Sequence, residues 1–563
     1  MEKELLLHVD SLRVAFHSAE GPNIAVNEIS FSVFRGEKLG IVGESGSGKT
    51  VTSYSILRLL ENQTSNKTQG AIIYKNSDEE VDLLTLPSEK LRRIRGRKIS
   101  IVFQEPMSSL NPVLKCGRQV KEIMDVHNIR QSDERKKYIL DLFSALALPE
   151  PKRIYNSYPH ELSGGQLQRV NIAMALATEP DIIICDEPTT ALDVTVQAQI
   201  LDLLEMCVEK FNVALIFISH DLDVIASLCD RVLVMYKGDI VEEGELPETF
   251  SSPRHKYTQA LLQCKPNREN KELQLPTVQS ILNGQYKPQK RNEINVDSGL
   301  PVIRVNDLKV HFSSGGGMFF GKKTTVKAVD GVSFELFKNE ILGIVGESGS
   351  GKSTVAYSLS GLVQPTAGEM YYGNRTISSE EYKTDSDLRR NIQLVFQNPY
   401  ASLNPQLSIG SAVMEPMIFH KLCEKSHAKR EMLRLLDQVG LDESFAKRYP
   451  HQLSGGQRQR VCIARALSLK PEVLICDESV SALDVSVQAQ ILNLLNNLRE
   501  EYGLSLIFIS HDLAVVHYLC DRILVMRSGH IVEKGTSDQV MQDPQMEYTK
   551  RLIDSIPGNF QLR

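Results

Sequence analysis

The chain has 563 residues, more than one hydrophobic core usually organises, so we expect at least two domains. Apolar residues make up 42% of the chain and charged residues 24%, which is ordinary for a soluble globular protein. The net charge of −6 argues against a protein that binds nucleic acid without sequence preference, because such binding needs a large basic surface.

The cysteines and the apolar runs indicate the cellular compartment and whether the chain crosses a membrane. The nine cysteines include no C-x-x-C pair, so the sequence predicts neither a zinc site nor a disulfide framework and favours a reducing, cytoplasmic compartment. The first residues are too few and too acidic to form a secretory signal. The longest apolar runs fall far below the ~20 residues that cross a bilayer, so we expect no membrane-spanning segment.

The first motif in chain order is a glycine-rich loop between an apolar run, 39–42, and a helical pattern. It fits G-x-x-x-x-G-K-[ST] with the residues Gly43, Glu44, Ser45, Gly46, Ser47, Gly48, Lys49 and Thr50. The glycines let backbone N–H groups face phosphates, and the start of the helix adds a favourable dipole. We expect Lys49 to contact the β- and γ-phosphates of a nucleotide and Thr50 to ligate Mg²⁺.

Apolar residues at helical spacing between about 110 and 160 predict an inserted helical subdomain. Leu162 to Gln166 then read LSGGQ and open another helical pattern. A serine there is most often an N-cap, and Ser163, Gly164 and Gly165 would also expose N–H donors that suit an anion.

An apolar strand, 182–185, ends in Asp186 and Glu187. Ligands of doubly wound sheets lie at the carboxyl ends of strands, so Asp186 suits the Mg²⁺ shell and Glu187 can accept a proton from attacking water. His220 follows the apolar strand 214–218. A histidine in that position is usually structural, and only its place after the other motifs makes it a candidate.

Every motif returns in the second half of the chain. Lys49 corresponds to Lys352, and the later motifs recur at one constant interval, so that two copies of a whole domain are expected. Short Val/Ile/Leu runs alternate with helical patterns in each copy, which predicts an α/β fold with a mostly parallel sheet core. The second set consists of Gly346, Glu347, Ser348, Gly349, Ser350, Gly351, Lys352, Ser353, Ser454, Gly455, Gly456, Asp477, Glu478 and His511.

The predicted domains are residues 1–264 and 301–563, with a polar linker over the surface at 265–300. A second helical subdomain is expected between about 403 and 451. Copy two also carries an insertion at 313–325, in which Met318 to Phe320 could touch a partner or lipid, although a partly ordered loop is the simpler interpretation.

LSGGQ between a P-loop and an Asp-Glu strand end resembles the signature of the ABC ATPase family, and the resemblance extends over nearly the whole chain. It implies that His220 and His511 are switch histidines. It also implies that Gln104 and Gln397 are the Q-loop glutamines and that they join Thr50, Asp186, Ser353 and Asp477 as ligands of the metal. Phe16 and Phe312 fall where family members stack an aromatic ring on adenine, although a strand Phe is as often a core residue.

In ABC ATPases each ATP lies between the P-loop of one domain and the signature of the other. The resemblance therefore implies a first site that joins the P-loop at 43–50, Gln104, Asp186, Glu187 and His220 with Ser454, Gly455 and Gly456. The second site would join the P-loop at 346–353, Gln397, Asp477, Glu478 and His511 with Ser163, Gly164 and Gly165. ATP and Mg²⁺ are the implied cofactors.

Narrower features resemble the peptide/nickel-type importers. They are VFQEPMSSLNP at 102–112, VFQNPYASLNP at 395–405, and the domain ends around Tyr257-Thr258 and Tyr548-Thr549. The resemblance implies an ATPase at the cytoplasmic face of the inner membrane that serves two permease subunits and, indirectly, a substrate-binding protein outside. Peptides are the expected substrate; nickel, glutathione and glycosides remain alternatives. Some relatives hold an iron–sulfur cluster in a cysteine-rich tail, but only Cys264 lies near that region, so no cluster is expected.

Two other functions share the same motifs. A tandem ABC translation factor acting on ribosomes is disfavoured by the acidic charge and by the lack of a long basic arm. An exporter ATPase is disfavoured only by the importer-like segments, because phosphate chemistry does not determine the direction of transport.

Overall fold

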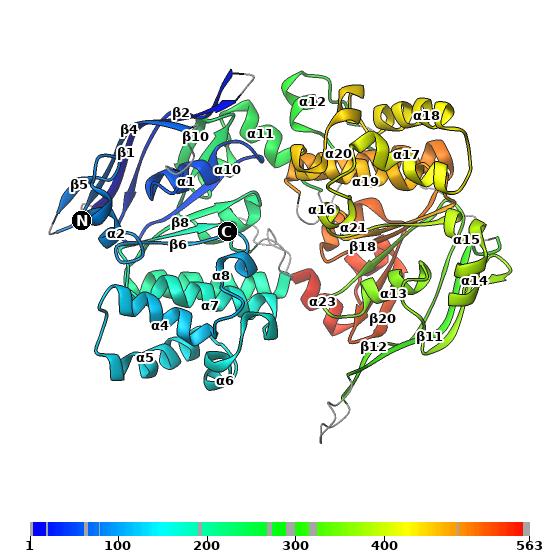
Figure 1. Ribbon diagram of the computed structural model, residues 1–563, viewed down its shortest axis with the longest axis horizontal. Helices are drawn as coiled ribbons and strands as arrows, with labels where there is room; N and C mark the ends of the chain where they lie inside the picture. Colours follow the sequence, from blue (N-terminus) through cyan, green and yellow to red (C-terminus); the bar gives the residue numbers. More distant parts are fainter. Residues whose placement is uncertain are drawn as a thin grey trace. The chain divides into compact units, whose positions relative to one another are not determined.

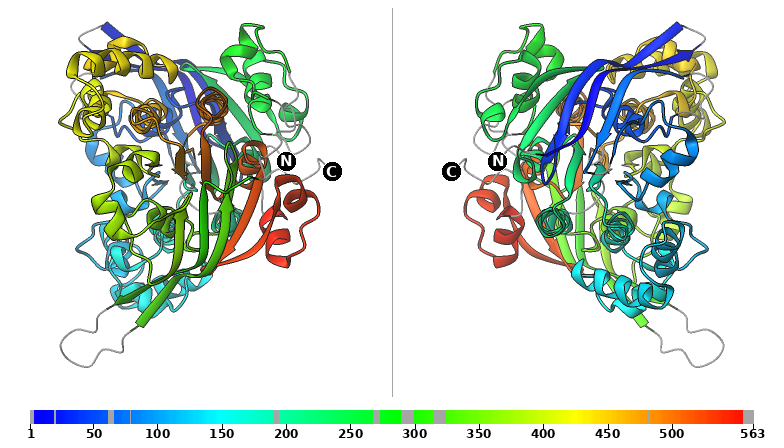
Figure 2. Two further views of the ribbon diagram at one scale, coloured as in Figure 1. Left: turned by 90° about the vertical axis from the view of Figure 1, so that its right-hand side faces the viewer. Right: turned by 90° about the vertical axis from the view of Figure 1, so that its left-hand side faces the viewer.

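The computed structural model (Figures 1 and 2) describes residues 4–18, 21–60, 66–77, 79–189, 194–266, 273–288, 299–314, 324–480 and 483–554. The chain divides into two compact units: the first runs to Gln263 and the second begins at Cys264. Each unit is built in the same way, from a six-stranded sheet, a four-stranded sheet and surrounding helices.

The six-stranded sheet of the first unit has the strand order β10-β9-β3-β8-β7-β6. All neighbouring strands run parallel except β9 and β10, so the predicted mostly parallel core is confirmed. Buried Val, Ile and Leu fill these strands on both faces, as a sheet covered by helices requires. The strands are β3 (Lys38–Val42), β6 (Ile99–Val102), β7 (Ile182–Asp186), β8 (Ala214–Ser219), β9 (Arg231–Tyr236) and β10 (Asp239–Glu245).

A second, antiparallel sheet in this unit was not predicted from the sequence. Its order is β2-β1-β4-β5, and its strands are β1 (Leu5–Ser18), β2 (Gly21–Phe34), β4 (Asn66–Lys75) and β5 (Glu80–Asp82). One face buries Leu7, Val9, Leu12 and Val14 of β1, and a bulge between Val9 and Leu12 keeps the apolar side chains on that face.

Helices of the first unit fall into two groups. The expected helical insertion is present as α3 (Pro106–Ser109), α4 (Cys116–Val126), α5 (Ser132–Ala145) and α6 (Pro151–Asn156). The remaining helices are α1 (Lys49–Ile56), α2 (Ser88–Ile94), α7 (Gly164–Leu176), α8 (Val194–Phe211), α9 (Leu222–Leu228), α10 (Glu248–Ser251) and α11 (Lys256–Gln263), with a 3-10 turn at Pro159–Glu161.

The sheets of the second unit repeat those of the first. The six-stranded sheet has the order β16-β17-β18-β13-β19-β20 and the four-stranded sheet the order β12-β11-β14-β15. The strands are β11 (Ile303–Ser314), β12 (Thr324–Leu336), β13 (Ile341–Val345), β14 (Ala367–Tyr372), β15 (Arg375–Thr376), β16 (Ile392–Val395), β17 (Val473–Asp477), β18 (Ser505–Ser510), β19 (Arg522–Arg527) and β20 (His530–Thr536).

The helices of the second unit also follow the first, and its helical insertion is formed mainly by α17 and α18. They are α13 (Lys352–Leu359), α14 (Ser379–Thr384), α15 (Ser386–Asn391), α16 (Pro399–Ser402), α17 (Ile409–Phe419), α18 (Lys425–Gln438), α19 (Gly455–Leu467), α20 (Val485–Tyr502), α21 (Leu513–Leu519), α22 (Ser537–Gln542) and α23 (Glu547–Asp554), with 3-10 turns at Glu443–Lys447 and Pro450–Gln452.

Part of the segment between the two ABC-like repeats packs on the second unit, which differs from the predicted surface linker. Leu275 is 6% exposed and belongs to the core around α20. The side-chain amide of Asn493 accepts a bond from the Leu275 N–H and donates one to its carbonyl, both at 2.8 Å. The short helix α12 (Val278–Leu282) follows.

Two further expectations concern membranes. Among the residues that the structure describes, no helix combines the length and apolarity needed to cross a bilayer. Met318 to Phe320, for which a contact with a partner or lipid was the alternative to a partly ordered loop, lie outside the described residues.

Candidate functional site

The glycine-rich loop of the first unit connects the end of β3 to the start of α1. Gly43, Gly46 and Gly48 all have positive φ angles, a conformation that side chains with a Cβ rarely adopt. A Cβ on Gly43 would also come within 2.2 Å of the Met235 carbonyl oxygen, so space as well as backbone angle requires glycine there. The turn can therefore direct backbone N–H groups toward a bound anion.

Lys49 is folded back over this loop. Its ammonium donates to the carbonyl oxygens of Gly43 at 2.7 Å and Glu44 at 3.0 Å, and the residue is only 5% exposed. A buried ammonium held by carbonyl dipoles over a helix start is positioned to bind a phosphate chain.

The carboxylate of Asp186, at the end of β7, lies beside the start of α1. The Thr50 hydroxyl donates to its Oδ1 at 3.1 Å, while its Oδ2 is buried without a hydrogen-bond partner in the described part of the chain. Burial, the largest influence, raises the pKa of Asp186 to about 6. An unpartnered carboxylate oxygen next to a hydroxyl is the donor set that Mg²⁺ uses alongside phosphate oxygens and water, so these residues fit the ion.

Glu187 brings two more of the expected residues together. Its Oε2 accepts a bond of 2.9 Å from the Gln104 side-chain amide and lies 3.2 Å from Nδ1 of His220. Glu187 adopts a left-handed backbone conformation, φ 47°, that is fixed by the 3.0 Å bond from its N–H to the Ile218 carbonyl on β8. Such strain, on the order of 1–3 kcal/mol, persists where the surrounding structure imposes it, typically at functional sites.

The second unit repeats each contact. Lys352 donates to Gly346 and Glu347 at 2.7 and 2.9 Å. The other pairs are Ser353 Oγ with Asp477 Oδ1 at 3.0 Å, Gln397 Nε2 with Glu478 Oε2 at 2.7 Å, and His511 Nδ1 with Glu478 Oε2 at 3.6 Å. Oδ2 of Asp477 is again buried without a partner among the described residues, and Glu478 again has a positive φ, 45°.

In the second site Glu478 and His511 each shift the pKa of the other. Burial alone would lower the pKa of His511, but the hydrogen bond and charge of Glu478 outweigh it and raise that pKa above the ordinary 6.5. Burial likewise opposes ionisation of Glu478, but His511 lowers the pKa of this carboxyl. Each partner of the pair thus favours the charged form of the other.

The signature residues form exposed helix starts. Ser163 caps α7 by accepting the N–H of Gln166 at 3.4 Å, and Ser454 caps α19 in the same way with Gln457. The second glycine of each signature has a packing reason: a Cβ there would come within 2.6 Å of Val196 or, in the second unit, within 2.3 Å of Val487.

The two aromatic residues differ in exposure. Phe16 on β1 is partly buried against the core, whereas Phe312 on β11 is 48% exposed. Phe312 is thus the more exposed of the two, and stacking on a base requires an accessible ring face.

One contact of the P-loop was not anticipated. The hydroxyl of Tyr257, on α11, lies 3.0 Å from the backbone nitrogen of Glu44, and Tyr548 makes the same contact to Glu347 at 3.2 Å. The sequence marked these tyrosines only as family-like features of the domain ends. Their distance along the chain from the P-loop gave no signal of the contact.

A groove beside the Q-loop strand recurs in both units. In the first unit, of about 210 Å³, Leu57, Phe103 and Ile123 contribute to its lining. In the second, of about 800 Å³, the corresponding Ser360, Phe396 and Pro416 do so. Phe419 also lines the second groove and is 76% exposed. An apolar residue of that exposure beside a groove marks a surface suited to a partner.

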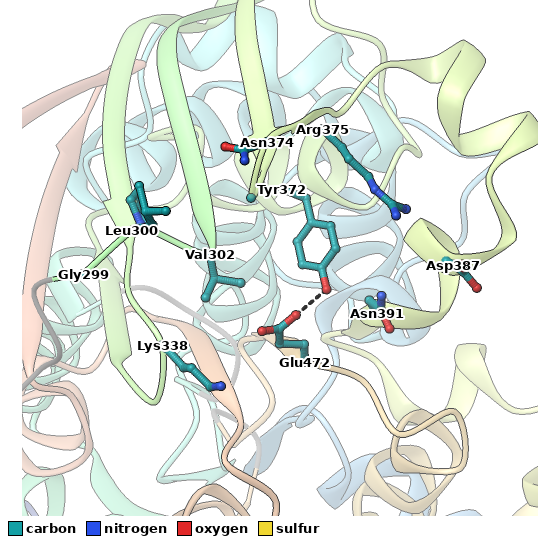
Figure 3. A pocket seen from close by; sticks show the side chains of 12 residues that line it. Gly299, Leu300, Val302, Lys338, Tyr372, Asn374, Arg375, Asp387, Asn391 and Glu472 are labelled. Atoms are coloured by element: carbon teal, nitrogen blue, oxygen red, sulfur yellow. Dashed lines mark hydrogen bonds between the residues drawn. The ribbon is translucent and has the colours of Figure 1, made fainter.

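A different pocket of the second unit, about 520 Å³, lies at the amino end of β17 (Figure 3). The Tyr372 hydroxyl donates to Glu472 across it. Glu472 precedes β17, and Asp477 ends that strand, roughly 16 Å away at 3.3 Å per residue. This pocket is therefore separate from the P-loop.

Comparison with known proteins shows which family the chain resembles. Residues 26–190 and 329–481 match the ABC transporter family, and residues 241–290 and 532–561 match the C-terminal region of oligopeptide/dipeptide transporters. The glutathione import ATP-binding protein GsiA of Salmonella paratyphi A is 43% identical over 98% of this chain and 89% of its own. That of Pectobacterium atrosepticum is 42% identical over 99% and 90%. Among solved structures, the ATP-binding cassette MJ0796 bound to ADP and Pi aligns with 42% of this chain and 98% of its own, at 30% identity and TM-score 0.37.

The family matches fall on both repeats and include both P-loops, both Q-loop glutamines and both Asp-Glu strand ends. The relatives align from one end of this chain to the other, so the tandem arrangement is shared with them. With two ABC domains and two matches to the oligopeptide/dipeptide transporter region, the chain belongs to the ABC transporter ATPases and is a tandem ATP-binding subunit of the peptide-type importer family.

Proposed function

We propose that both units bind and hydrolyse MgATP and that this hydrolysis drives the import of short peptides through separate permease subunits. The observation that carries the proposal is the recurrence, in each unit, of one complete set of groups: a buried lysine over the P-loop, a hydroxyl–aspartate pair, and a glutamate bonded to a glutamine and a histidine. Neither set has lost a member, so we propose that both sites turn over.

Each residue has a role that its contacts support. Lys49 and Lys352 bind phosphate oxygens, while Thr50 with Asp186, and Ser353 with Asp477, would hold Mg²⁺. That ion would neutralise charge on the phosphate oxygens. Glu187 and Glu478 accept the proton of the attacking water.

The histidine and glutamine of each site position the glutamate. In the second unit the hydrogen bond and charge of His511 lower the pKa of Glu478 and so favour the ionised form, which a proton acceptor requires. Gln397 donates to the same oxygen and fixes the orientation of the carboxylate. We assign His220 and Gln104 the same roles at Glu187.

The signature helices complete the sites in this proposal. Ser163, Gly164 and Gly165 would bind the nucleotide held by the second P-loop, and Ser454, Gly455 and Gly456 that held by the first. The exposed, serine-capped starts of α7 and α19 support this assignment, because their N–H groups and helix dipoles attract anionic oxygens.

Permease subunits are the partners of an ABC importer ATPase, and we propose that they dock at the groove beside each Q-loop. The groove contacts the strand that ends just before Gln104 or Gln397, so a helix bound there could sense the state of the glutamine and its glutamate. A peripheral position at the cytoplasmic face of the inner membrane follows, with a substrate-binding protein acting from outside through the permeases.

The substrate class is inferred from relatives. The curated relatives import glutathione, a tripeptide, and the family region at both domain ends is that of oligopeptide/dipeptide transporters. A short peptide of the size of glutathione is therefore the substrate we propose.

Reconstitution of the chain with the permeases that co-purify with it tests this function. Vesicles loaded with ATP and Mg²⁺ should take up labelled glutathione or a labelled tripeptide only in the presence of the binding protein. Uptake that persists with Glu187→Gln and Glu478→Gln together, or failure to recover any permease with the wild-type chain, would contradict the proposal.

A further inference from the structure

The carboxyl-terminal helix of each unit contacts the P-loop through one tyrosine. We propose that Tyr257 and Tyr548 are positioning residues of the two nucleotide sites, whose hydroxyls hold the second P-loop residue by its backbone N–H. This inference rests on the proposed nucleotide sites and goes beyond them, because it assigns a role in ATP binding to the domain ends.

The first unit shows why the contact matters for nucleotide binding. The Glu44 residue is held from two sides: Tyr257 accepts its N–H at 3.0 Å, and Lys49 donates to its carbonyl oxygen at 3.0 Å. The same ammonium bonds the Gly43 carbonyl at 2.7 Å. When bound phosphates draw Lys49 away from these carbonyl oxygens, the hydrogen bond from the Glu44 N–H to Tyr257 still restrains the beginning of the P-loop.

The tyrosine is itself fixed in place. Tyr257 is fully buried, and its ring packs on Tyr236 of β9 with centroids 4.2 Å apart. The helix α11 that carries it is anchored at its start, since the Glu242 carboxylate of β10 accepts the N–H groups of Arg254 and His255 at 2.7 and 3.1 Å. A rigid support of this kind is what a positioning group needs.

The second unit provides an independent copy. Tyr548 accepts the Glu347 N–H at 3.2 Å, and Glu533 of β20 anchors α23 through the N–H groups of Gln545 and Met546. The packing of the ring differs, because Arg527 lies 4.9 Å over Tyr548 where the first unit has a tyrosine packed at a tilt of 31°. The hydroxyl contact is retained although the support of the ring differs, which points to the hydroxyl as the functional group.

Loss of the hydroxyl should weaken ATP binding more than turnover. The tyrosine hydroxyl bonds the P-loop both in the ATP-bound ground state and in the transition state. Its removal therefore weakens binding of both states by a similar amount. One hydrogen bond of ordinary strength corresponds to a change of about 3- to 10-fold in an equilibrium constant. We expect the KM for ATP and the Kd for ATPγS to rise by about that factor and kcat to stay within about 2-fold of the wild type.

The experiment compares the full chain carrying Tyr257→Phe, Tyr548→Phe or both with two matched controls. Tyr74→Phe removes a hydroxyl that donates to the Asp181 carboxylate in the first unit. Tyr372→Phe removes the one that donates to Glu472 in the second (Figure 3). Kinetic constants, ATPγS affinity and Tm are measured for each. The proposal is supported if the site variants raise KM and Kd while the controls lower only Tm. It is overturned if KM and Kd stay unchanged, or if the controls raise them equally.

Two measurements keep the result interpretable. If the Phe variants fail to fold, hydrogen exchange of the P-loop amides in the wild-type chain decides, because a Glu44 amide that exchanges at the rate of an unbonded one overturns the contact. The Lys49→Ala and Lys352→Ala double variant tests the nucleotide sites themselves. If the double lysine variant binds ATPγS as tightly as the wild type, the assignment of the P-loops as nucleotide sites is wrong. If the lysine variant binds ATPγS weakly but the tyrosine variants bind it as tightly as the wild type, only the positioning role of the tyrosines is wrong.

Discussion

The Thr50 hydroxyl donates to Oδ1 of Asp186 at 3.1 Å, and Oδ2 of the same buried carboxylate has no partner in the described part of the chain. Ser353 and Asp477 repeat this relationship at 3.0 Å. Burial raises the pKa of Asp186 to about 6, so the protein without cation holds this carboxylate in an unfavourable environment. The fold thus accepts a local loss of stability that a bound cation would relieve.

Asp186→Asn should therefore stabilise the cation-free protein. A folded-state pKa raised from 3.8 to about 6 means that ionisation opposes folding at any pH above both values. At pH 8 we expect the variant to gain on the order of 3 kcal/mol, and below about pH 4 the difference should vanish. Thermal unfolding with EDTA at both pH values checks this. The variant should also lose the stabilisation that Mg²⁺ with ATPγS gives the wild type; an apo variant less stable than wild type at pH 8 would contradict the interpretation.

Glu187→Gln combined with Glu478→Gln should abolish turnover while the chain retains ATP. The amide keeps the size of the side chain and still accepts the bond from the glutamine of the Q-loop, but it cannot take a proton. We expect kcat to fall by at least about 100-fold, with Kd for ATP within a few-fold of wild type. Single-turnover hydrolysis and filter binding separate the two quantities. Each single variant serves as the control, and hydrolysis at the wild-type rate in the double variant would remove the general-base assignment.

Most of the catalytic set could be predicted from the sequence because its members belong to local motifs. The P-loop, the strand-end carboxylates and His220 each sit at a junction of a strand with a loop or helix, and parallel strands bring such junctions to one edge of the sheet. The structure accordingly brings Gln104, Glu187 and His220 together, although they lie far apart in the chain.

Other features depend on packing that no local pattern reports. The left-handed conformation of Glu187 follows from its N–H bonding to β8, and nothing in the residue type indicates it. Leu275 stands in a polar stretch, yet it is buried because Asn493 satisfies both of its backbone groups. The antiparallel sheets were missed because their long strands carry bulges that interrupt the apolar alternation.

Stability of the second unit should depend on pH through His511 and Glu478. The raised pKa of His511 means that its contribution is present below 6.5 and lost as pH rises through the folded value. The lowered pKa of Glu478 means that its contribution is present above 4.5 and lost as pH falls. His511→Gln should therefore lower Tm most between about pH 5 and 6, by roughly 3 °C, and little at pH 9. His530→Gln, at an exposed position of β20, is the control. A Tm difference that is equal at pH 5.5 and pH 9 would show that no ion pair contributes.

Phe419→Asp should separate permease docking from catalysis. Phe419 ends α17, is 76% exposed and lines the groove beside Gln397, and the described residues that line this groove include none of the groups proposed to bind nucleotide. A buried aromatic at an interface commonly contributes 2 kcal/mol or more to binding, so recovery of permeases with the chain should fall by about 30-fold. ATP hydrolysis by the isolated chain should remain unchanged. Leu300→Asp, at an apolar position that is 80% exposed in the other pocket of this unit, provides the matched control. Loss of permeases with Leu300→Asp but not with Phe419→Asp would place the docking surface elsewhere.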